Sequence, residues 1–192
     1  MTDLTLVHTA DVHVATIDAL APGAALTHMV RPDWLARALN GIDAVLLEEI
    51  STTIRTAKRK TARPVLCTCT TLGEVAETAG AIRLDWPMMQ TAAQVGGPVL
   101  LAYCLNSTLE PSKSLLQRAM SEAGNPDPIT LLPMTYLWSL FEQGDTAGFA
   151  TAIAKTISEF LAAHSNPTSK PAVVVLAQAS MAGAADLVTG LR

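Results

Sequence analysis

Charge is sparse in this sequence, and no stretch concentrates one sign of it. Charged residues make up 16% of the 192 and hydrophobic residues 49%, and the formal net charge is −4. Disordered chains have the opposite balance, so the composition predicts one large folded domain or two small ones. The one basic cluster, Lys58, Arg59, Lys60 and Arg63, is too short for a nucleic-acid surface and has the spacing of a solvated helix face. We therefore expect no nucleic-acid partner.

A long hydrophobic run is also absent. The longest uncharged stretch, residues 86–109, contains Pro87, Gly96, Gly97 and Pro98, which divide it into helix, turn and strand. The first residues place acidic and histidine side chains where a secretory signal would carry its basic and apolar regions. We expect a soluble, cytoplasmic protein with no membrane partner.

Cysteine is scarce, and its spacing fits neither a disulfide framework nor a zinc site. The three cysteines are Cys67, Cys69 and Cys104, an odd number in a chain that we expect to carry no export signal. The C-x-C pair differs from the C-x-x-C of zinc knuckles, and no histidine follows it at ligand spacing. The sequence therefore predicts free thiols and no metal.

Short apolar runs alternate with longer helix-forming segments, which is the pattern of parallel sheets with crossover helices. Val99–Ala102 and Val173–Leu176 are continuously apolar, as is typical of strands buried on both faces. Gly144 and Gly148 predict a break in the long helical segment near the C-terminus. The predicted strands are Leu4–His8, Leu26–Val30, Pro64–Cys67, Ala81–Leu84, Val99–Cys104, Ile129–Leu132 and Ala172–Leu176. The predicted helices are Asp33–Asn40, Asp43–Arg59, Leu72–Ala79, Met88–Val95, Pro111–Ala123, Thr135–His164 and Met181–Thr189.

A weak internal repeat favours two related halves. Residues 64–73 and 173–182 each carry an apolar strand, small polar residues and a helix start, with Cys69 and Gln178 in matching places. Leu4–His8 likewise parallels Val99–Tyr103. The junction after a strand is the carboxyl end of a parallel sheet, where ligands bind. Chance similarity among apolar strands is the alternative.

Cys69 is the best candidate for chemistry. It follows a predicted strand, precedes Thr70 and Thr71, and stands just before a predicted helix. Helix N–H groups and the helix dipole lower the pKa of a thiol, and together with hydroxyl groups they can hold a carboxylate. The alternative is an inert buried cysteine, which is our interpretation of Cys67. The part played by Cys104 stays open.

The run Val65–Glu77 resembles the first cysteine motif, Cys-Asn/Ser/Thr-Thr, of the Asp/Glu/hydantoin racemase superfamily. The resemblance covers nearly the whole chain, in order and at sensible spacing. Its further matches are His8-Thr9-Ala10, Ile82–Met88, Gly96-Gly97, Asn106–Ser112 and the strand Val173–Leu176.

The resemblance implies an α/β fold of two pseudo-symmetric, doubly wound lobes with mainly parallel sheets and an active-site cleft between them. Residues 1–96 plus 181–192 would form the first lobe, and residues 97–180 the second. It also implies catalysis without a cofactor or metal on a small carboxylate or amino-acid ligand. Two cysteines exchange the Cα proton in racemases of this superfamily, whereas a decarboxylase branch protonates its intermediate with one.

Carried over residue by residue, the resemblance makes Cys69 the catalytic thiol, with Thr70 and Thr71 as its carboxylate-holding neighbours. The second cysteine motif, Gly-Cys-Thr-Glu in typical racemases, is degenerate here, so the second cysteine is replaced by Gln178. The second-lobe residues expected to bind substrate are Ser107, Thr108, Gln178, Ala179 and Ser180.

Gln178 limits what the resemblance can imply about the reaction. A neutral amide cannot exchange a proton near neutral pH, although it keeps two donors and one acceptor for binding. Capping or turn chemistry is the alternative for Gln178, Thr108 and Ser180. His8, at the end of the first strand, is a candidate to orient substrate or supply the missing proton. A buried structural histidine is the alternative for His8, and Asp11 has similar standing.

The sequence thus leaves three classes of function open. The first is an amino-acid racemase or isomerase, or a one-thiol lyase of the same superfamily, in which Cys69 transfers a proton. The second is a small-carboxylate-binding protein that kept the site and lost the chemistry. The third is a protein whose lobes serve mainly as a dimer surface, and a homo-oligomer is compatible with each, since fold alone does not fix function.

Overall fold

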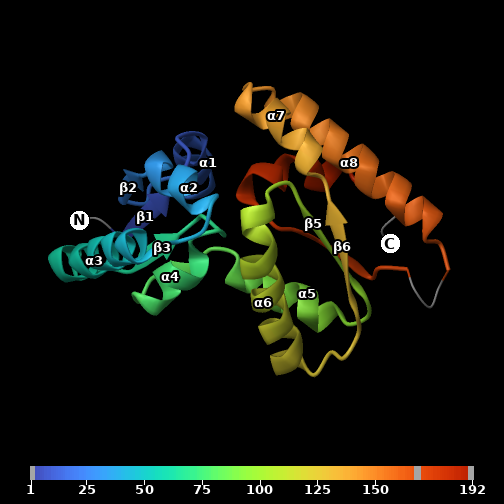
Figure 1. Ribbon diagram of the computed structural model, residues 1–192, viewed down its shortest axis with the longest axis horizontal. Helices are drawn as coiled ribbons and strands as arrows, with labels where there is room; N and C mark the ends of the chain where they lie inside the picture. Colours follow the sequence, from blue (N-terminus) through green and yellow to red (C-terminus); the bar gives the residue numbers. More distant parts are fainter. Residues whose placement is uncertain (1–2, 167–169, 190–192) are drawn as a thin grey trace. The chain divides into compact units, whose positions relative to one another are not determined.

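The computed structural model describes residues 3–166 and 170–189. The chain divides into two compact units, residues 1–85 and 86–192, and each is an α/β unit with a wholly parallel sheet (Figure 1). This confirms the predicted two-lobed α/β fold with parallel sheets.

The first unit has a four-stranded sheet in the order β2-β1-β3-β4. Its core lies on one face, where β1 and β3 pack against the long helix α3, whose polar side faces solvent. Asp43 starts α3 by accepting a hydrogen bond from the Leu46 N–H at 2.7 Å, as N-cap aspartates do. The strands are β1 (Leu4–His8), β2 (Leu26–Val30), β3 (Val65–Cys67) and β4 (Ile82–Arg83), and the helices are α1 (Val12–Leu20), α2 (Pro32–Ala38), α3 (Ala44–Thr61) and α4 (Gly73–Thr78).

The second unit has a three-stranded sheet in the order β6-β5-β7, covered on both faces. Alternate residues of the central strand face α5 and α6 on one side and α8 on the other, which accounts for its continuous apolar run. The strands are β5 (Val99–Tyr103), β6 (Ile129–Pro133) and β7 (Val173–Leu176), and the α-helices are α5 (Trp86–Val95), α6 (Asn106–Ala123), α7 (Trp138–Glu142) and α8 (Thr146–Ala163), with 3-10 helices η1 (Thr135–Leu137) and η2 (Ala179–Leu187).

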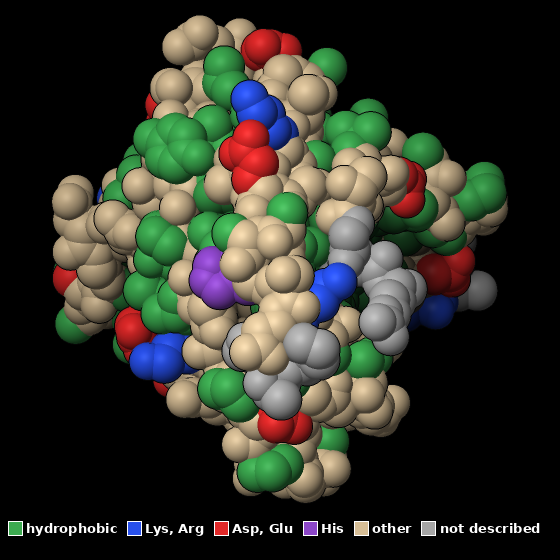
Figure 2. Space-filling view, turned by 90° about the vertical axis from the view of Figure 1, so that its right-hand side faces the viewer, with side chains coloured by type: hydrophobic (Ala, Val, Ile, Leu, Met, Phe, Trp, Pro, Cys, Tyr) green, Lys and Arg blue, Asp and Glu red, His purple; other side chains and the backbone are tan. Residues whose placement is uncertain are grey.

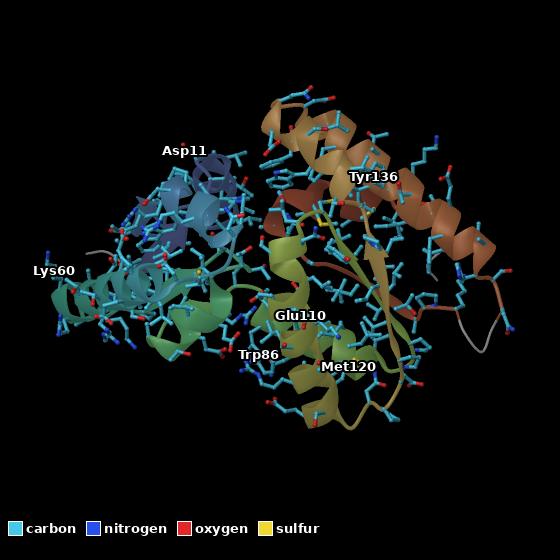
Figure 3. The ribbon with its side chains drawn as sticks, viewed as in Figure 1. Asp11, Lys60, Trp86, Glu110, Met120 and Tyr136 are labelled. Carbon is cyan, nitrogen blue, oxygen red and sulfur yellow. The ribbon has the colours of Figure 1, made fainter. Side chains whose placement is uncertain are left out.

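Side chains on α5 and α6 join these two helices within the second unit. Figure 3 labels Trp86 at the start of α5, and Glu110 and Met120 on α6. The Arg118 guanidinium of α6 lies 4.2 Å above the Trp86 ring, within the range of a cation–π contact. On the face of the molecule shown in Figure 2, acidic and basic side chains are interspersed with hydrophobic ones.

All seven predicted strands are confirmed, and the helices differ in three places. Helix α1 was not predicted, α6 begins at Asn106 with Pro111 inside it, and η2 is a 3-10 helix. The predicted break in the long helical segment is confirmed: α7 ends at Glu142, Gly144 has a φ of 80°, and the Asp145 side chain accepts a hydrogen bond from Gly148 N–H at the start of α8.

The boundary between the units differs from the expected lobes of residues 1–96 plus 181–192 and 97–180. Helix α5 belongs to the second unit because Met89 and Ala93 share a core with Leu116 of α6. Helix η2 also belongs there, because Met181 packs in one cluster with Phe149 of α8. Residues 190–192 lie outside the described part of the chain. Among the described residues, no helix combines the length and the hydrophobicity that a membrane span requires.

The basic cluster predicted to form a solvated helix face lies in and just after the last turn of α3 (Figure 3, Lys60). Lys58 Nζ donates to the Gly80 carbonyl at 2.7 Å, and Arg63 Nη1 lies 3.7 Å from the Asp3 carboxylate. Cations at the C-terminus of a helix interact favourably with its dipole. This cluster is therefore at the amino end of β3, the opposite edge of the sheet from Cys69.

Candidate functional site

The carboxyl edge of the first unit's sheet gathers short polar side chains from β1 and β3. β1 and β3 are adjacent and parallel, with Val7 opposite Cys67, so the residues that follow each strand emerge at the same edge. These residues are Thr9, after β1, and Thr68, Cys69, Thr70 and Thr71, after β3. The structure therefore brings the predicted Cys69, Thr70 and Thr71 together and adds Thr9 to them.

Four hydrogen-bond donors converge on the Cys69 sulfur. Two are the hydroxyl groups of Thr9 and Thr71, and two are the backbone N–H groups of Thr71 and Leu72. Thr9, Thr71 and Leu72 are buried, while Cys69 is half-buried. Hydrogen bonds of this kind favour the charged form of the group that accepts them. The donors around the sulfur are thus suited to an anion.

Burial nevertheless raises the pKa of the Cys69 thiol above its ordinary value, because desolvation outweighs the four hydrogen bonds. This corrects the expectation of a lowered pKa. That expectation relied on the dipole of the following helix, but α4 is only six residues long and begins at Gly73. The raised pKa favours the thiol form of Cys69 over the thiolate.

The other two cysteines are packed in hydrophobic cores. Cys67 lies in the core beneath α3 and Cys104 in the core beneath α8. Burial raises the pKa of each thiol to about 12. The interpretation of Cys67 as core packing is confirmed, and Cys104 has the same character. Cys69 is the one cysteine of the three that is not fully buried.

A buried ion pair supports the loop that carries Cys69. Arg83 Nε and Nη2 donate to the two Asp85 carboxylate oxygens at 2.9 and 2.8 Å, with side chains 4% and 12% exposed. The guanidinium lies against Gly73, where an added Cβ would be 2.7 Å from Arg83 Cζ. Gly73 N–H in turn donates to the Thr70 carbonyl at 3.0 Å. Because Asp85 occupies the fork of Arg83, this arginine acts as a support for the loop.

His8 is fully buried, and both of its ring nitrogens contact protein groups. Nδ1 lies 3.0 Å from Thr68 Oγ1, and Nε2 lies 2.8 Å from His28 Nδ1. Burial, with contributions from His28 and His13, lowers the pKa of His8 to about 4. These contacts fit a buried structural histidine and leave neither ring nitrogen of His8 for a direct substrate contact. Asp11 is exposed at the start of α1 (Figure 3) and makes no side-chain cap to that helix.

Sequence reasoning missed Thr9, Thr68, His28 and Asp18 as neighbours of the site. Thr9 and Thr68 carry a usable signal, since each follows a predicted strand directly, as Cys69 nearly does. The sequence gives no such signal for His28 and Asp18. Their positions beside His8 depend on the pairing of β2 with β1 and on helix α1, which was not predicted.

In the second unit, Gln178 occupies the place that Cys69 has in the first. Cys69 lies two residues beyond β3, which pairs with β1, and Gln178 lies two residues beyond β7, which pairs with β5. Gln178 Oε1 accepts hydrogen bonds from the backbone N–H groups of Cys104, at 2.7 Å, and Leu105, at 3.0 Å. The side chain is 8% exposed. The amide oxygen thus joins the region after β7 to the junction of β5 and α6. This capping role is the alternative to substrate binding that the sequence left open for Gln178.

The remaining predicted residues of the second unit surround the same edge. Thr108 is buried, and its hydroxyl donates to the Leu105 carbonyl at 2.7 Å, a local bond within the first turn of α6. Ser107 precedes it in α6, and Ala179 and Ser180 begin η2 directly after Gln178. Ser107, Thr108, Gln178, Ala179 and Ser180 are therefore brought together within this unit, and Thr108 and Gln178 have structural hydrogen bonds.

Within residues 3–166 and 170–189, no group of three or more His, Cys, Asp or Glu side chains is arranged to hold a metal ion. Comparison of the chain with protein-family models, curated proteins and solved structures gives no match.

Proposed function

We propose that Cys69 is the single proton-transfer group of a cofactor-independent enzyme of the Asp/Glu racemase type, acting at Cα of a small carboxylate or amino acid. The observation that carries this proposal is the convergence of four donors on a half-buried thiol at the carboxyl edge of a parallel sheet. Structural cysteines need no such donors. The sequence resemblance supplies the reaction class.

The four donors suit the reaction because they act on the charge that forms during it. When the thiol gives up its proton, the resulting thiolate accepts hydrogen bonds from Thr9, Thr71 and Leu72, which are already in place. A substrate carboxylate beside Cys69 would compete for the same donors. The two other thiols are buried in cores, so the proposed chemistry uses one thiol rather than two.

The raised pKa of Cys69 favours a second candidate, a lyase in which this thiol acts as the acid. In such a reaction the bond between Cα and the departing carboxylate breaks and CO₂ leaves. The electron pair remains on Cα, and the Cys69 S–H proton is transferred to it. The thiolate then recovers a proton from water. A protonated resting thiol is the form that this step requires.

The proposal is tested by Cα deuterium exchange in D₂O with both enantiomers of aspartate and glutamate. We expect exchange from one enantiomer, abolished by Cys69→Ala and retained by the matched variant Cys104→Ala. Racemisation should be slow, because loss of a positioned acid or base typically costs about 10²–10⁴-fold in rate. Exchange that survives Cys69→Ala would refute the assignment of Cys69.

The pH dependence separates the two chemical roles. If Cys69 removes the Cα proton, its rate should rise with pH up to the raised pKa of the thiol, because only the thiolate is a base. If Cys69 protonates a carbanion after decarboxylation, CO₂ release should instead fall across the same range. A carboxylate that protects Cys69 from alkylation without exchange or CO₂ release would indicate the binding protein.

A further inference from the structure

Four side chains of the first unit form a continuous line of close polar contacts, from the surface to the residue before Cys69. Asp18 Oδ1 lies 3.1 Å from His28 Nε2, and His28 Nδ1 lies 2.8 Å from His8 Nε2. His8 Nδ1 lies 3.0 Å from Thr68 Oγ1, which also lies 3.2 Å from the Val7 carbonyl oxygen. The Asp18 side chain is 56% exposed and that of His28 15%, whereas His8 and Thr68 are buried.

The pleat of the sheet explains why these side chains meet. Val7 faces the core beneath α3, so Leu6 and His8 point to the opposite face. His28 is paired across from Leu6 in β2, which puts it on the same face as His8. Asp18 reaches this face from α1.

When both histidines are neutral, only one arrangement of protons satisfies every contact to a ring nitrogen. The Asp18 carboxylate can only accept, so His28 carries its proton on Nε2 and leaves Nδ1 bare. His8 Nε2 must then donate to His28, which leaves His8 Nδ1 as an acceptor. The Thr68 hydroxyl therefore donates to His8.

Protonation of His28 reverses this arrangement. Both nitrogens of His28 then donate, one to Asp18 and the other to His8 Nε2. His8 stays neutral but moves its proton to Nδ1, which donates to Thr68 Oγ1. The Thr68 hydroxyl must turn to the Val7 carbonyl, which also accepts the Thr68 N–H at 3.0 Å.

His28 is the better place for the added proton. The titratable groups that face His8 are His28 from β2 and His13 and Asp18 from α1. His28 contacts the Asp18 carboxylate directly and is partly exposed, whereas burial and the neighbouring histidines disfavour a charge on His8.

We propose that Asp18, His28, His8 and Thr68 form a proton-linked switch, in which one proton taken up by His28 exchanges the tautomer of His8 and redirects the Thr68 hydroxyl from His8 to β1. His8 and Thr68 directly precede Thr9 and Cys69, the two residues whose side chains meet at the site. The switch thus connects the pH of the solvent to the backbone that holds the thiol, whatever reaction the thiol performs.

The test is a titration of the histidine ring ¹⁵N resonances, which distinguish bare from protonated nitrogens. The chain has four histidines, and His164, at the end of α8 in the second unit, is an internal reference. As the pH is lowered and His28 takes up its proton, we expect His8 Nδ1 to change from bare to protonated and His8 Nε2 to change in the opposite sense. Both changes should share the midpoint of His28.

Three variants sharpen this test. Thr68→Val removes one hydrogen bond from the neutral form, the one that His8 accepts, and two from the protonated form, those to His8 and to the Val7 carbonyl. Because the protonated form loses more, the common midpoint should move to lower pH, while Thr68→Ser should leave it in place. Asp18→Asn removes the carboxylate and should also lower the midpoint. A His8 tautomer that stays the same while His28 titrates, a separate midpoint for His8, or an unchanged midpoint in Thr68→Val would overturn the proposal.

Discussion

Replacing Gln178 by leucine removes the acceptor that joins β7 to the junction of β5 and α6. Two backbone N–H groups, those of Cys104 and Leu105, donate to the same amide oxygen at 2.7 and 3.0 Å. Leucine fills a similar volume without an acceptor. The variant therefore isolates the two hydrogen bonds from the packing of the side chain.

The expected loss follows from the burial of the two donors. Cys104 is fully buried, so its N–H becomes an unsatisfied buried donor, which costs about 1–3 kcal/mol. Leu105 is half-buried, so water replaces part of its bond, and its share is at most about 1 kcal/mol. We expect Gln178→Leu to lower the free energy of unfolding by about 1–4 kcal/mol, against a typical total of about 5–15 kcal/mol.

The measurement is urea unfolding followed by far-UV circular dichroism. Gln94→Leu, on the exposed part of α5, is the control and should change stability by less than about 0.5 kcal/mol. Gln178→Glu keeps an acceptor at the N-terminus of α6, where negative charge is favoured, and should lose far less than Gln178→Leu. If the leucine variant is as stable as the Gln94→Leu control, the amide oxygen is not a structural acceptor and the capping interpretation fails.

Three further predictions concern the first unit. In native protein, iodoacetamide should label Cys69 before Cys67 and Cys104, because Cys69 is the one cysteine of the three that is not fully buried. Thr9→Val should slow this labelling by removing a hydrogen bond that favours the thiolate. If Cys67 or Cys104 is labelled before Cys69, the assignment of the site is wrong. Arg83→Met should lower the free energy of unfolding by about 3–5 kcal/mol, because it leaves the largely buried Asp85 carboxylate without its partner. The double variant Arg83→Met with Asp85→Asn should lose less stability in the same urea assay. Equal losses of stability in the two variants would be evidence against a charge effect. Ala62→Gly should stabilise by about 1 kcal/mol, because Ala62 ends α3 with a φ of 52°, which disfavours residues with a Cβ; an unchanged urea midpoint would count against this strain.

The strands were predictable because their signal is local. β5 is apolar along its whole length, and burial on both faces is what such a run requires. Helix α1 gave no such signal, since none of its residues is buried and no apolar stripe marks one face. Helix α6 was predicted to begin at Pro111, a residue favoured at the first helical position, but the structure starts it at Asn106.

The chemistry of the site depended on contacts that sequence spacing does not contain. The position of Cys69 after β3 was predictable, as were its neighbours Thr70 and Thr71. The direction of the shift in the Cys69 pKa was not predictable, because it depends on how far the surrounding residues exclude water from the sulfur. Thr9 is 60 residues away in the chain, and the parallel pairing of β1 with β3 brings it to the thiol.

The two units use the same position for opposite purposes. Beyond β3, the Thr9 hydroxyl and backbone N–H groups converge on the Cys69 sulfur, which remains half-buried. Beyond β7, backbone N–H groups at the end of β5 converge on the amide oxygen of Gln178, which holds them permanently. Donors at the carboxyl edge of a parallel sheet require an acceptor, and a side-chain oxygen within the protein satisfies them without a ligand. A thiol satisfies its donors only weakly until it loses its proton, since sulfur is a poor acceptor when neutral. The first unit therefore retains donors that gain most when negative charge appears, and the second has used its own to stabilise the fold.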